Sequence, residues 1–239
     1  MGRIGTIINR KGKQDAKKAK IFTKMGRVLM VAAREGGSDP EYNPTLKTAI
    51  EKAKASNMPG ENIDRAIKKG AGELEGMVFE ELTYEGYGPG GVAVLVEILT
   101  DNKNRTAADV RSYFTKAKGN LGANGCVGFL FDHVGVIAID LVEDMDPDTI
   151  EMDAIESGAS DFSVEEDHVE IITDPQDFGV VRDYLKDRGY DFSMAELRYL
   201  PNTYTRLTEE EDLKNMSKLI DLLEDNDDVQ NVYHNWEEE

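Results

Sequence analysis

The order of secondary structure predicted for residues 134–200 constrains the fold of this chain more than any other feature. The residue pattern indicates strands at 136–141, near 162–164, at 169–173 and at 191–199, with helices at 147–157 and 175–188. This β-α-β-β-α-β order is that of the ferredoxin-like fold. We therefore expect a protein of the α+β class.

The first 70 residues have a helical pattern instead. Residues 15–36 carry apolar side chains at helical spacing and end in a glycine pair. An Asn-Pro step at position 43 starts a second helix, and a third is predicted at 59–70. The narrow apolar stripes predict a small three-helix bundle. Residues 1–13 show no periodicity and are expected to be a mobile arm.

The segments that flank the ferredoxin-like part are expected to form one further sheet. Strands are predicted at 78–84, 91–99, 126–131 and 229–233, with helices at 107–118 and 209–224. A chain tolerates an insertion where domain termini lie close together, so we interpret the ferredoxin-like part as inserted. The predicted domains are a basic arm and bundle (1–76), a central α+β domain (77–131 plus 203–239) and the inserted acidic domain (132–202).

Charge is distributed unevenly over these domains. The whole chain has 28 basic and 47 acidic residues, a net charge of −19. Residues 1–34, however, carry ten basic side chains against the single acid Asp15, whereas residues 132–202 carry 4 basic and 20 acidic ones. Salt screens distant charge beyond about 8–10 Å, so a basic segment can attract phosphate in spite of the acidic body.

Two interpretations of the basic segment stand side by side, a nucleic-acid-binding surface and an ordinary solvated helix face. The first requires that the protein's own carboxylates do not neutralise the basic side chains. The candidate nucleic-acid-binding residues are Arg3, Arg10, Lys11, Lys13, Lys17, Lys18, Lys20, Lys24, Arg27, Lys68, Lys69 and Arg105. Such residues contact phosphates and position a protein, but they do not read base sequence.

The segment Thr100–Thr106 (TDNKNRT) lies between a predicted strand and a predicted helix. Free N–H groups at a helix start can bind an anion, which is one interpretation of this segment. The other is a capping loop in which Asp101 or Asn104 turns the chain.

Other motifs carry little chemistry. Residues 86–91 match G-x-G-x-x-G, but Pro89 interrupts the turn and a strand follows, so a hairpin turn is favoured over a dinucleotide site. The aspartates at 144, 146 and 148 lack the glycine and glutamate of a calcium loop and are better explained by loop solvation and helix capping.

The remaining reactive side chains do not form a catalytic or metal-binding pattern. The three histidines are far apart in sequence and are expected at the surface or at strand ends. Cys126 is expected to be a buried, inert thiol in an apolar strand. We therefore expect no enzyme activity, no metal and no cofactor. The chain has no secretory signal and no membrane span, which predicts a cytoplasmic protein without a membrane partner.

Several long segments resemble one known family. They are Ile21–Lys24 (IFTK), Val31–Gly37 (VAAREGG), Ala49–Gly70 (AIEKAKASNMPGENIDRAIKKG), Tyr84–Val94 (YEGYGPGGVAV) and Thr100–Thr106. Together they are similar to the YebC family over nearly the whole chain. The resemblance implies a three-domain α+β architecture around a cleft, with an inserted third domain.

The same resemblance implies a function. YebC proteins are commonly described as cytoplasmic probable transcriptional regulators that bind DNA, and related members as translation factors that help ribosomes through consecutive prolines. The opening of this chain departs from the family, because Gly2–Thr6 and Asn9–Lys11 lack the usual tryptophan and histidine. The expected function is a DNA-binding transcriptional regulator, and the alternative is a ribosome-associated translation factor that binds ribosomal RNA. A monomer is favoured, and the acidic domains are possible contacts for a protein partner or the ribosome.

Overall fold

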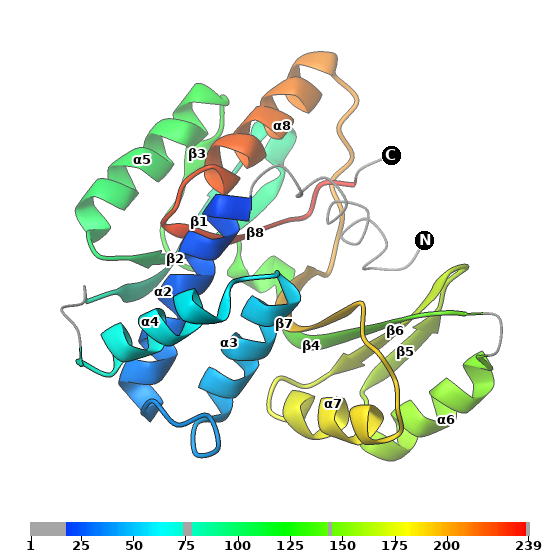
Figure 1. The fold of residues 1–239 in the computed structure, drawn as a ribbon. Helices are drawn as coiled ribbons and strands as arrows, with labels where there is room; N and C mark the ends of the chain where they lie inside the picture. Colours follow the sequence, from blue (N-terminus) through cyan, green and yellow to red (C-terminus); the bar gives the residue numbers. More distant parts are fainter. Residues whose placement is uncertain (1–17, 74–77, 143–144, 238–239) are drawn as a thin grey trace. The chain divides into compact units, whose positions relative to one another are not determined.

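The computed structural model describes residues 18–73, 78–142 and 145–237. Within these ranges the protein is α+β, as predicted, with seven α-helices and two four-stranded antiparallel sheets (Figure 1). The described residues divide into two compact units. Residues 129–203 form one, here called the insert unit, and residues 18–128 with 204–237 form the other, here called the main unit.

The main unit begins with a three-helix bundle. Its helices are α2 (Lys18–Gly36), α3 (Pro44–Ala55) and α4 (Gly60–Gly70). The predicted cap at Asn43 is confirmed, since its side-chain oxygen accepts the N–H of Leu46 at 3.0 Å. Its amide nitrogen donates to the carbonyl of Ala32 at 2.8 Å, which ties the start of α3 to α2. The predicted arm, residues 1–13, lies outside the described residues.

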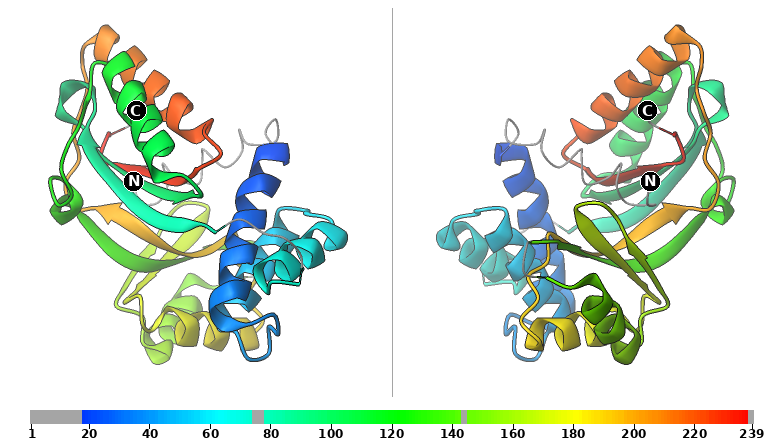
Figure 2. Two further views of the ribbon diagram at one scale, coloured as in Figure 1. Left: turned by 90° about the vertical axis from the view of Figure 1, so that its left-hand side faces the viewer. Right: turned by 90° about the vertical axis from the view of Figure 1, so that its right-hand side faces the viewer.

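The rest of the main unit is a sheet covered by two helices. Its strands are β1 (Glu80–Tyr87), β2 (Ala93–Thr100), β3 (Asn120–Leu121) and β8 (Val229–His234), in the order β3-β1-β2-β8. Figure 2 shows α5 (Lys103–Lys116, green) and α8 (Glu210–Glu224, orange) over the same face of this sheet. β8 pairs with β2, so the predicted return of the chain end to this sheet is confirmed.

The bundle and this sheet have separate apolar cores. Leu29, Leu46 and Ile63 lie in the core of the bundle, whereas Phe114 and Met216 lie between the sheet and its helices. The segment 86–91 holds the end of β1 and the turn of the β1–β2 hairpin, with the short 3-10 helix η2 (Pro89–Gly91), as the hairpin interpretation predicted. The division of the chain into three domains stays a prediction.

The strand predicted at 126–131 is wrong. Residues 122–127 form a loop, and a 3-10 helix, η3 (Gly128–Leu130), follows. The reason is the buried carboxylate of Glu85, which accepts the backbone N–H groups of Gly125, Val127 and Gly128 at 2.7–2.8 Å. Because these donors are already bonded, they are not available to a neighbouring strand. Cys126 is therefore half-buried in a loop, and burial raises the pKa of its thiol.

The insert unit has the predicted ferredoxin-like topology. Its elements in chain order are β4 (Phe131–Asp140), α6 (Pro147–Ser157), β5 (Asp161–Val164), β6 (His168–Thr173), α7 (Phe178–Asp187) and β7 (Met194–Pro201). All pairings in the sheet β5-β6-β4-β7 are antiparallel. Asp146 caps α6 and accepts the hydroxyl of Thr149 at 2.8 Å, which confirms the capping interpretation of this aspartate.

His168 is the first residue of β6, which agrees with the strand-end position expected for the histidines, but it is not at the surface. Its ring is buried, with Nδ1 2.6 Å from Asp167 and Nε2 3.0 Å from the buried carboxylate of Glu170. Burial alone lowers the pKa of His168, but the hydrogen bonds to these two carboxylates raise it on balance. His168 therefore connects the buried carboxylate of Glu170 to the exposed carboxylate of Asp167 within the insert unit.

Candidate nucleic-acid interface

Three of the predicted nucleic-acid-binding residues form a row along α2. Lys20, Lys24 and Arg27 are spaced at i, i+4 and i+7, so they lie on one face of the helix. We call these three residues the cationic row. The row faces the end of α8 and the turn that leads into β8, because all three side chains donate to residues 224–228.

The two lysines of the cationic row bind the C-terminal end of α8. The Nζ of Lys20 lies 3.0 Å from a carboxylate oxygen of Asp225 and 3.1 Å from its carbonyl oxygen. The Nζ of Lys24 donates to the carbonyl of Glu224 at 3.0 Å. The last carbonyls of a helix lack partners in the helix and carry its negative dipole end, so lysines are suited to this position.

Arg27 makes the most extensive contacts of the row. Its Nη1 donates to the carbonyls of Leu99 (3.1 Å) and Asp227 (2.8 Å). The same atom lies 2.6 Å from a carboxylate oxygen of Asp228, and the guanidinium lies 5.3 Å from the ring centroid of Phe79. Arg27 therefore connects α2 to the end of β2 and to the turn between α8 and β8.

Asp228 is the centre of a buried polar cluster. Its other carboxylate oxygen accepts from the hydroxyls of Thr100 (3.1 Å) and Thr106 (2.6 Å) and from Arg105 (2.8 Å). Burial alone raises the pKa of Asp228, but the hydrogen bonds from Arg105, Thr106 and Arg27 lower it to about 2. The carboxylate is thus held ionised between two guanidinium groups.

The segment Thr100–Thr106 is a capping loop and a partner of this cluster. Asn102 caps α5, since its side chain accepts the N–H of Arg105 at 3.1 Å. The predicted cap at Asp101 or Asn104 is therefore wrong by one or two positions. The Arg105 guanidinium also donates to Asp101 at 2.9 Å, and its hydrogen bonds to Asp228 and Asp101 raise its pKa.

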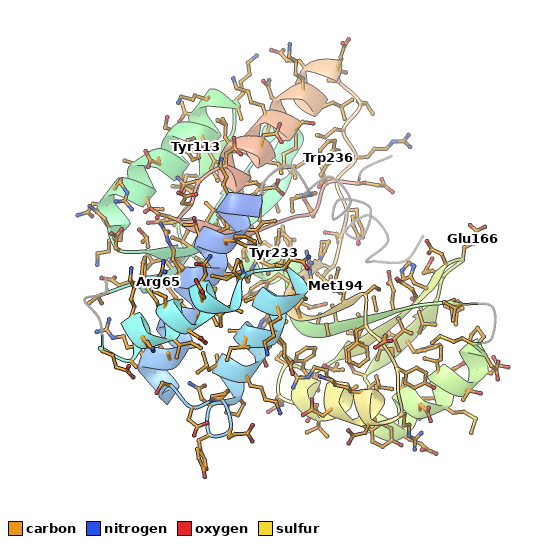
Figure 3. The ribbon with its side chains drawn as sticks, in the orientation of Figure 1. Arg65, Tyr113, Glu166, Met194, Tyr233 and Trp236 are labelled. Atoms are coloured by element: carbon orange, nitrogen blue, oxygen red, sulfur yellow. The ribbon has the colours of Figure 1, made fainter. Side chains whose placement is uncertain are left out.

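A second group of basic side chains is exposed on α3 and α4. No ion-pair partner for these side chains lies among the described residues. The group, here called the exposed basic set, consists of Lys47, Lys54, Arg65, Lys68 and Lys69. The last three gather in the second half of α4, where Figure 3 labels Arg65.

The predicted residues thus separate into four groups. Lys20, Lys24, Arg27 and Arg105 are engaged with the protein's own acidic groups and carbonyls, Lys68 and Lys69 are exposed, and Lys18 begins α2. The other candidates, Arg3, Arg10, Lys11, Lys13 and Lys17, lie outside the described residues.

The sequence interpretation missed Asp228 and the free members Lys47, Lys54 and Arg65. Asp228 ends the acidic stretch Glu224–Asp228, which resembles a solvated loop, and nothing local in the sequence distinguishes it from Asp227. The exposure of Lys47 and Arg65 could have been predicted from helical spacing, because each lies next to a buried position of its helix and outside the apolar stripe.

Within the described ranges there is no group of three or more metal-binding side chains. No helix in the same ranges is both long and apolar enough to cross a bilayer. The arrangement is that of an α+β protein with a helical bundle, a helix-covered sheet and a ferredoxin-like insertion, and with an exposed basic set on the bundle.

This class of protein has known members. Residues 3–73 match the family model described as the TACO1/YebC protein N-terminal domain, and residues 79–236 match the one described as the TACO1/YebC second and third domain. The chain belongs to the TACO1/YebC family.

Similar proteins span the full chain. A Clostridioides difficile protein named "Probable transcriptional regulatory protein" is 62% identical over 239 residues, and the match covers 100% of both chains. One of the same name from Finegoldia magna is 53% identical, covering 98% of this chain and 96% of the relative. The crystal structure of a conserved hypothetical protein from Aquifex aeolicus has 47% identity and a TM-score of 0.83, covering 93% of this chain and 91% of the other.

Proposed function

We propose that this protein is a nucleic-acid-binding regulator of gene expression, and specifically a DNA-binding transcriptional regulator in the cytoplasm with no enzyme activity. The observation that carries the proposal is the exposed basic set on α3 and α4, in a chain whose overall charge is −19. When unpaired lysine and arginine side chains contact phosphates, counterions condensed on the nucleic acid are released, which favours binding. The names of the relatives, probable transcriptional regulatory proteins, support the same function.

The proposed nucleic-acid contact lies on α4 and not, as the sequence indicated, mainly on α2. The cationic row is already occupied by residues 224–228. Arg65, Lys68 and Lys69, in contrast, are exposed in two successive turns of α4. These three residues, with Lys47 and Lys54 of α3, are the proposed phosphate contacts among the described residues. Arg3, Arg10, Lys11, Lys13 and Lys17 remain candidates of the same kind.

Fluorescence anisotropy with labelled duplex DNA over 50–200 mM salt tests the proposal. Each phosphate contact contributes a slope of about −0.9 in log K against log salt. The triple change Arg65→Gln, Lys68→Gln and Lys69→Gln should therefore weaken binding and flatten the slope by about 2.7.

The matched control changes three exposed lysines elsewhere in the main unit, Lys103, Lys214 and Lys218, to glutamine. An equal loss in this control would show that net charge, not α4, determines binding. A wild-type protein that binds folded ribosomal RNA but not DNA under the same conditions would replace transcription by the ribosomal alternative.

A further inference from the structure

The turn that occupies the cationic row has the chemistry of a phosphate chain. Residues 224–228 (EDNDD), here called the acidic turn, present carbonyl oxygens and carboxylates to three consecutive basic side chains of α2. Sugar–phosphate backbones offer the same kind of group, a series of anionic oxygen acceptors, to lysine and arginine. The acidic turn and a nucleic acid are therefore alternative partners for the cationic row.

The contacts of the acidic turn differ in how easily they can exchange. The side chains of Lys20 and Asp225 are 41% and 52% exposed, and ion pairs at such exposure contribute little to stability. The side chains of Arg27 and Asp228 are only 15% and 5% exposed, and both make further hydrogen bonds. The exposed Lys20–Asp225 contact can thus be replaced while the buried Arg27–Asp228 pair holds the bundle in place.

Lysine is suited to a contact that exchanges its partner, and arginine to one that stays closed. Lysine is a compact charge on a flexible four-carbon stem, so Lys20 and Lys24 can turn to a new acceptor without movement of α2. The guanidinium of Arg27 is a rigid fork that is fixed by three acceptors, two of them backbone carbonyls.

We infer that the acidic turn is an autoinhibitory contact that covers a phosphate-binding site on α2. A nucleic-acid backbone that binds the bundle replaces the carboxylate of Asp225 at Lys20 and the carbonyl of Glu224 at Lys24. The Arg27–Asp228 pair remains closed during this exchange. The inference rests on the proposed function, and it adds a second, covered site to the exposed basic set of α3 and α4.

The inference predicts a gain of affinity from the loss of one acid. Asp225→Asn removes the competing carboxylate but keeps the backbone and size of the residue. We expect it to bind duplex DNA about two- to fivefold more tightly at 50 mM salt, which is the range that an exposed ion pair provides. Asp221→Asn is the matched control, because it removes the same charge from an exposed position one turn earlier on α8.

A double-variant cycle separates competition at Lys20 from a general effect of charge. The gain from Asp225→Asn should disappear when Lys20→Gln is also present, because the ammonium group for which Asp225 and a phosphate compete is then absent. Far-UV circular dichroism of each variant checks that the fold is retained. A gain that persists in the Lys20→Gln background, or an equal gain from Asp221→Asn, would overturn the inference.

The same anisotropy assay distinguishes the inference from the proposed function. Binding by the wild type with no difference between Asp225→Asn and Asp221→Asn rejects the autoinhibitory contact and leaves the proposed function standing. Binding by Asp225→Asn alone supports the autoinhibitory contact in its strongest form. Absence of binding by every variant to DNA and to RNA at 50 mM salt rejects both.

Discussion

The Nη1 atom of Arg27 lies 2.6 Å from a carboxylate oxygen of Asp228, although 201 positions separate the two residues in the sequence. The pair joins α2 of the bundle to the turn that leads into β8. Buried ion pairs are costly to break by removal of one partner, since the other charge is left without compensation. This pair and its threonine partners therefore fix the bundle to the sheet of the main unit.

The first prediction concerns the buried cluster. Asp228→Asn should lower the free energy of unfolding of the main unit by about 3 kcal/mol, because Arg27 and Arg105 lose their shared anion. Urea unfolding followed by the fluorescence of Trp236, the single tryptophan of the chain, measures this change. Trp236 packs against the core between the sheet and its helices, so it reports on the correct unit.

Asp227→Asn is the control for this variant. Asp227 is exposed, and Arg27 uses only its backbone carbonyl, which the substitution keeps. A loss of similar size in both variants would mean that the charge of the turn, and not the buried cluster, determines stability.

The second prediction is an acid-dependent loss of stability. The pKa of Asp228 is about 2 in the folded protein against an ordinary value of 3.8, so the unfolded chain binds this proton more readily. The stabilisation is complete above the ordinary value and is lost as pH falls from about 4 toward 2. Urea unfolding at pH 5 and pH 2.5 measures the free energy of unfolding at each pH. The decrease in this free energy between pH 5 and pH 2.5 should be smaller for Asp228→Asn than for the wild type.

The third prediction concerns His168 in the insert unit. Its pKa is raised above the ordinary value of 6.5, so its contribution to stability is present below that value and is lost as pH rises through the higher, folded pKa. An NMR titration of the three histidines should show His168 with a pKa above 6.5, and Glu170→Gln should lower it. Glu166→Gln, an exposed carboxylate in the same unit (Figure 3), should leave it unchanged. A pKa that is insensitive to Glu170→Gln would contradict the assignment.

The fourth prediction tests the close packing of α4 on α2. A Cβ atom at Gly70 would overlap the backbone carbonyl of Met30, so Gly70→Ala should destabilise the bundle by about 1–3 kcal/mol. Gly60→Ala, at the other end of α4, meets no atom within 4 Å and should be neutral or stabilise by about 0.4–1 kcal/mol. Urea unfolding followed by helical circular dichroism compares the two, and equal effects would refute the packing argument.

Much of the fold could be predicted because its signals are local. The cap at Asn43, the turn at 86–91 and the order of elements in the insert unit each depend on residues close in sequence. The return of 229–233 to the first sheet followed from the interpretation of the ferredoxin-like part as an insertion. The strand at 126–131 failed because a carboxylate 40 to 43 positions earlier, Glu85, takes its backbone donors.

The candidate site was predictable only in part, for a related reason. Basic residues at helical spacing on α2 are visible in the sequence, but their partners are 200 positions away. A row of lysines that is exposed and one that is covered by an acidic turn have the same local pattern. Only the tertiary structure therefore separates Lys20, Lys24 and Arg27 from Lys68 and Lys69.

The pairing of Phe131 with Pro201 at the ends of β4 and β7 has a mechanical consequence. The chain enters the insert unit beside one of these residues and leaves beside the other. Tension applied through the flanking chain would act on this first pair alone and then on each following pair in turn. Such unzipping needs less force than shearing all pairs together, so the insert unit should open under load from this end.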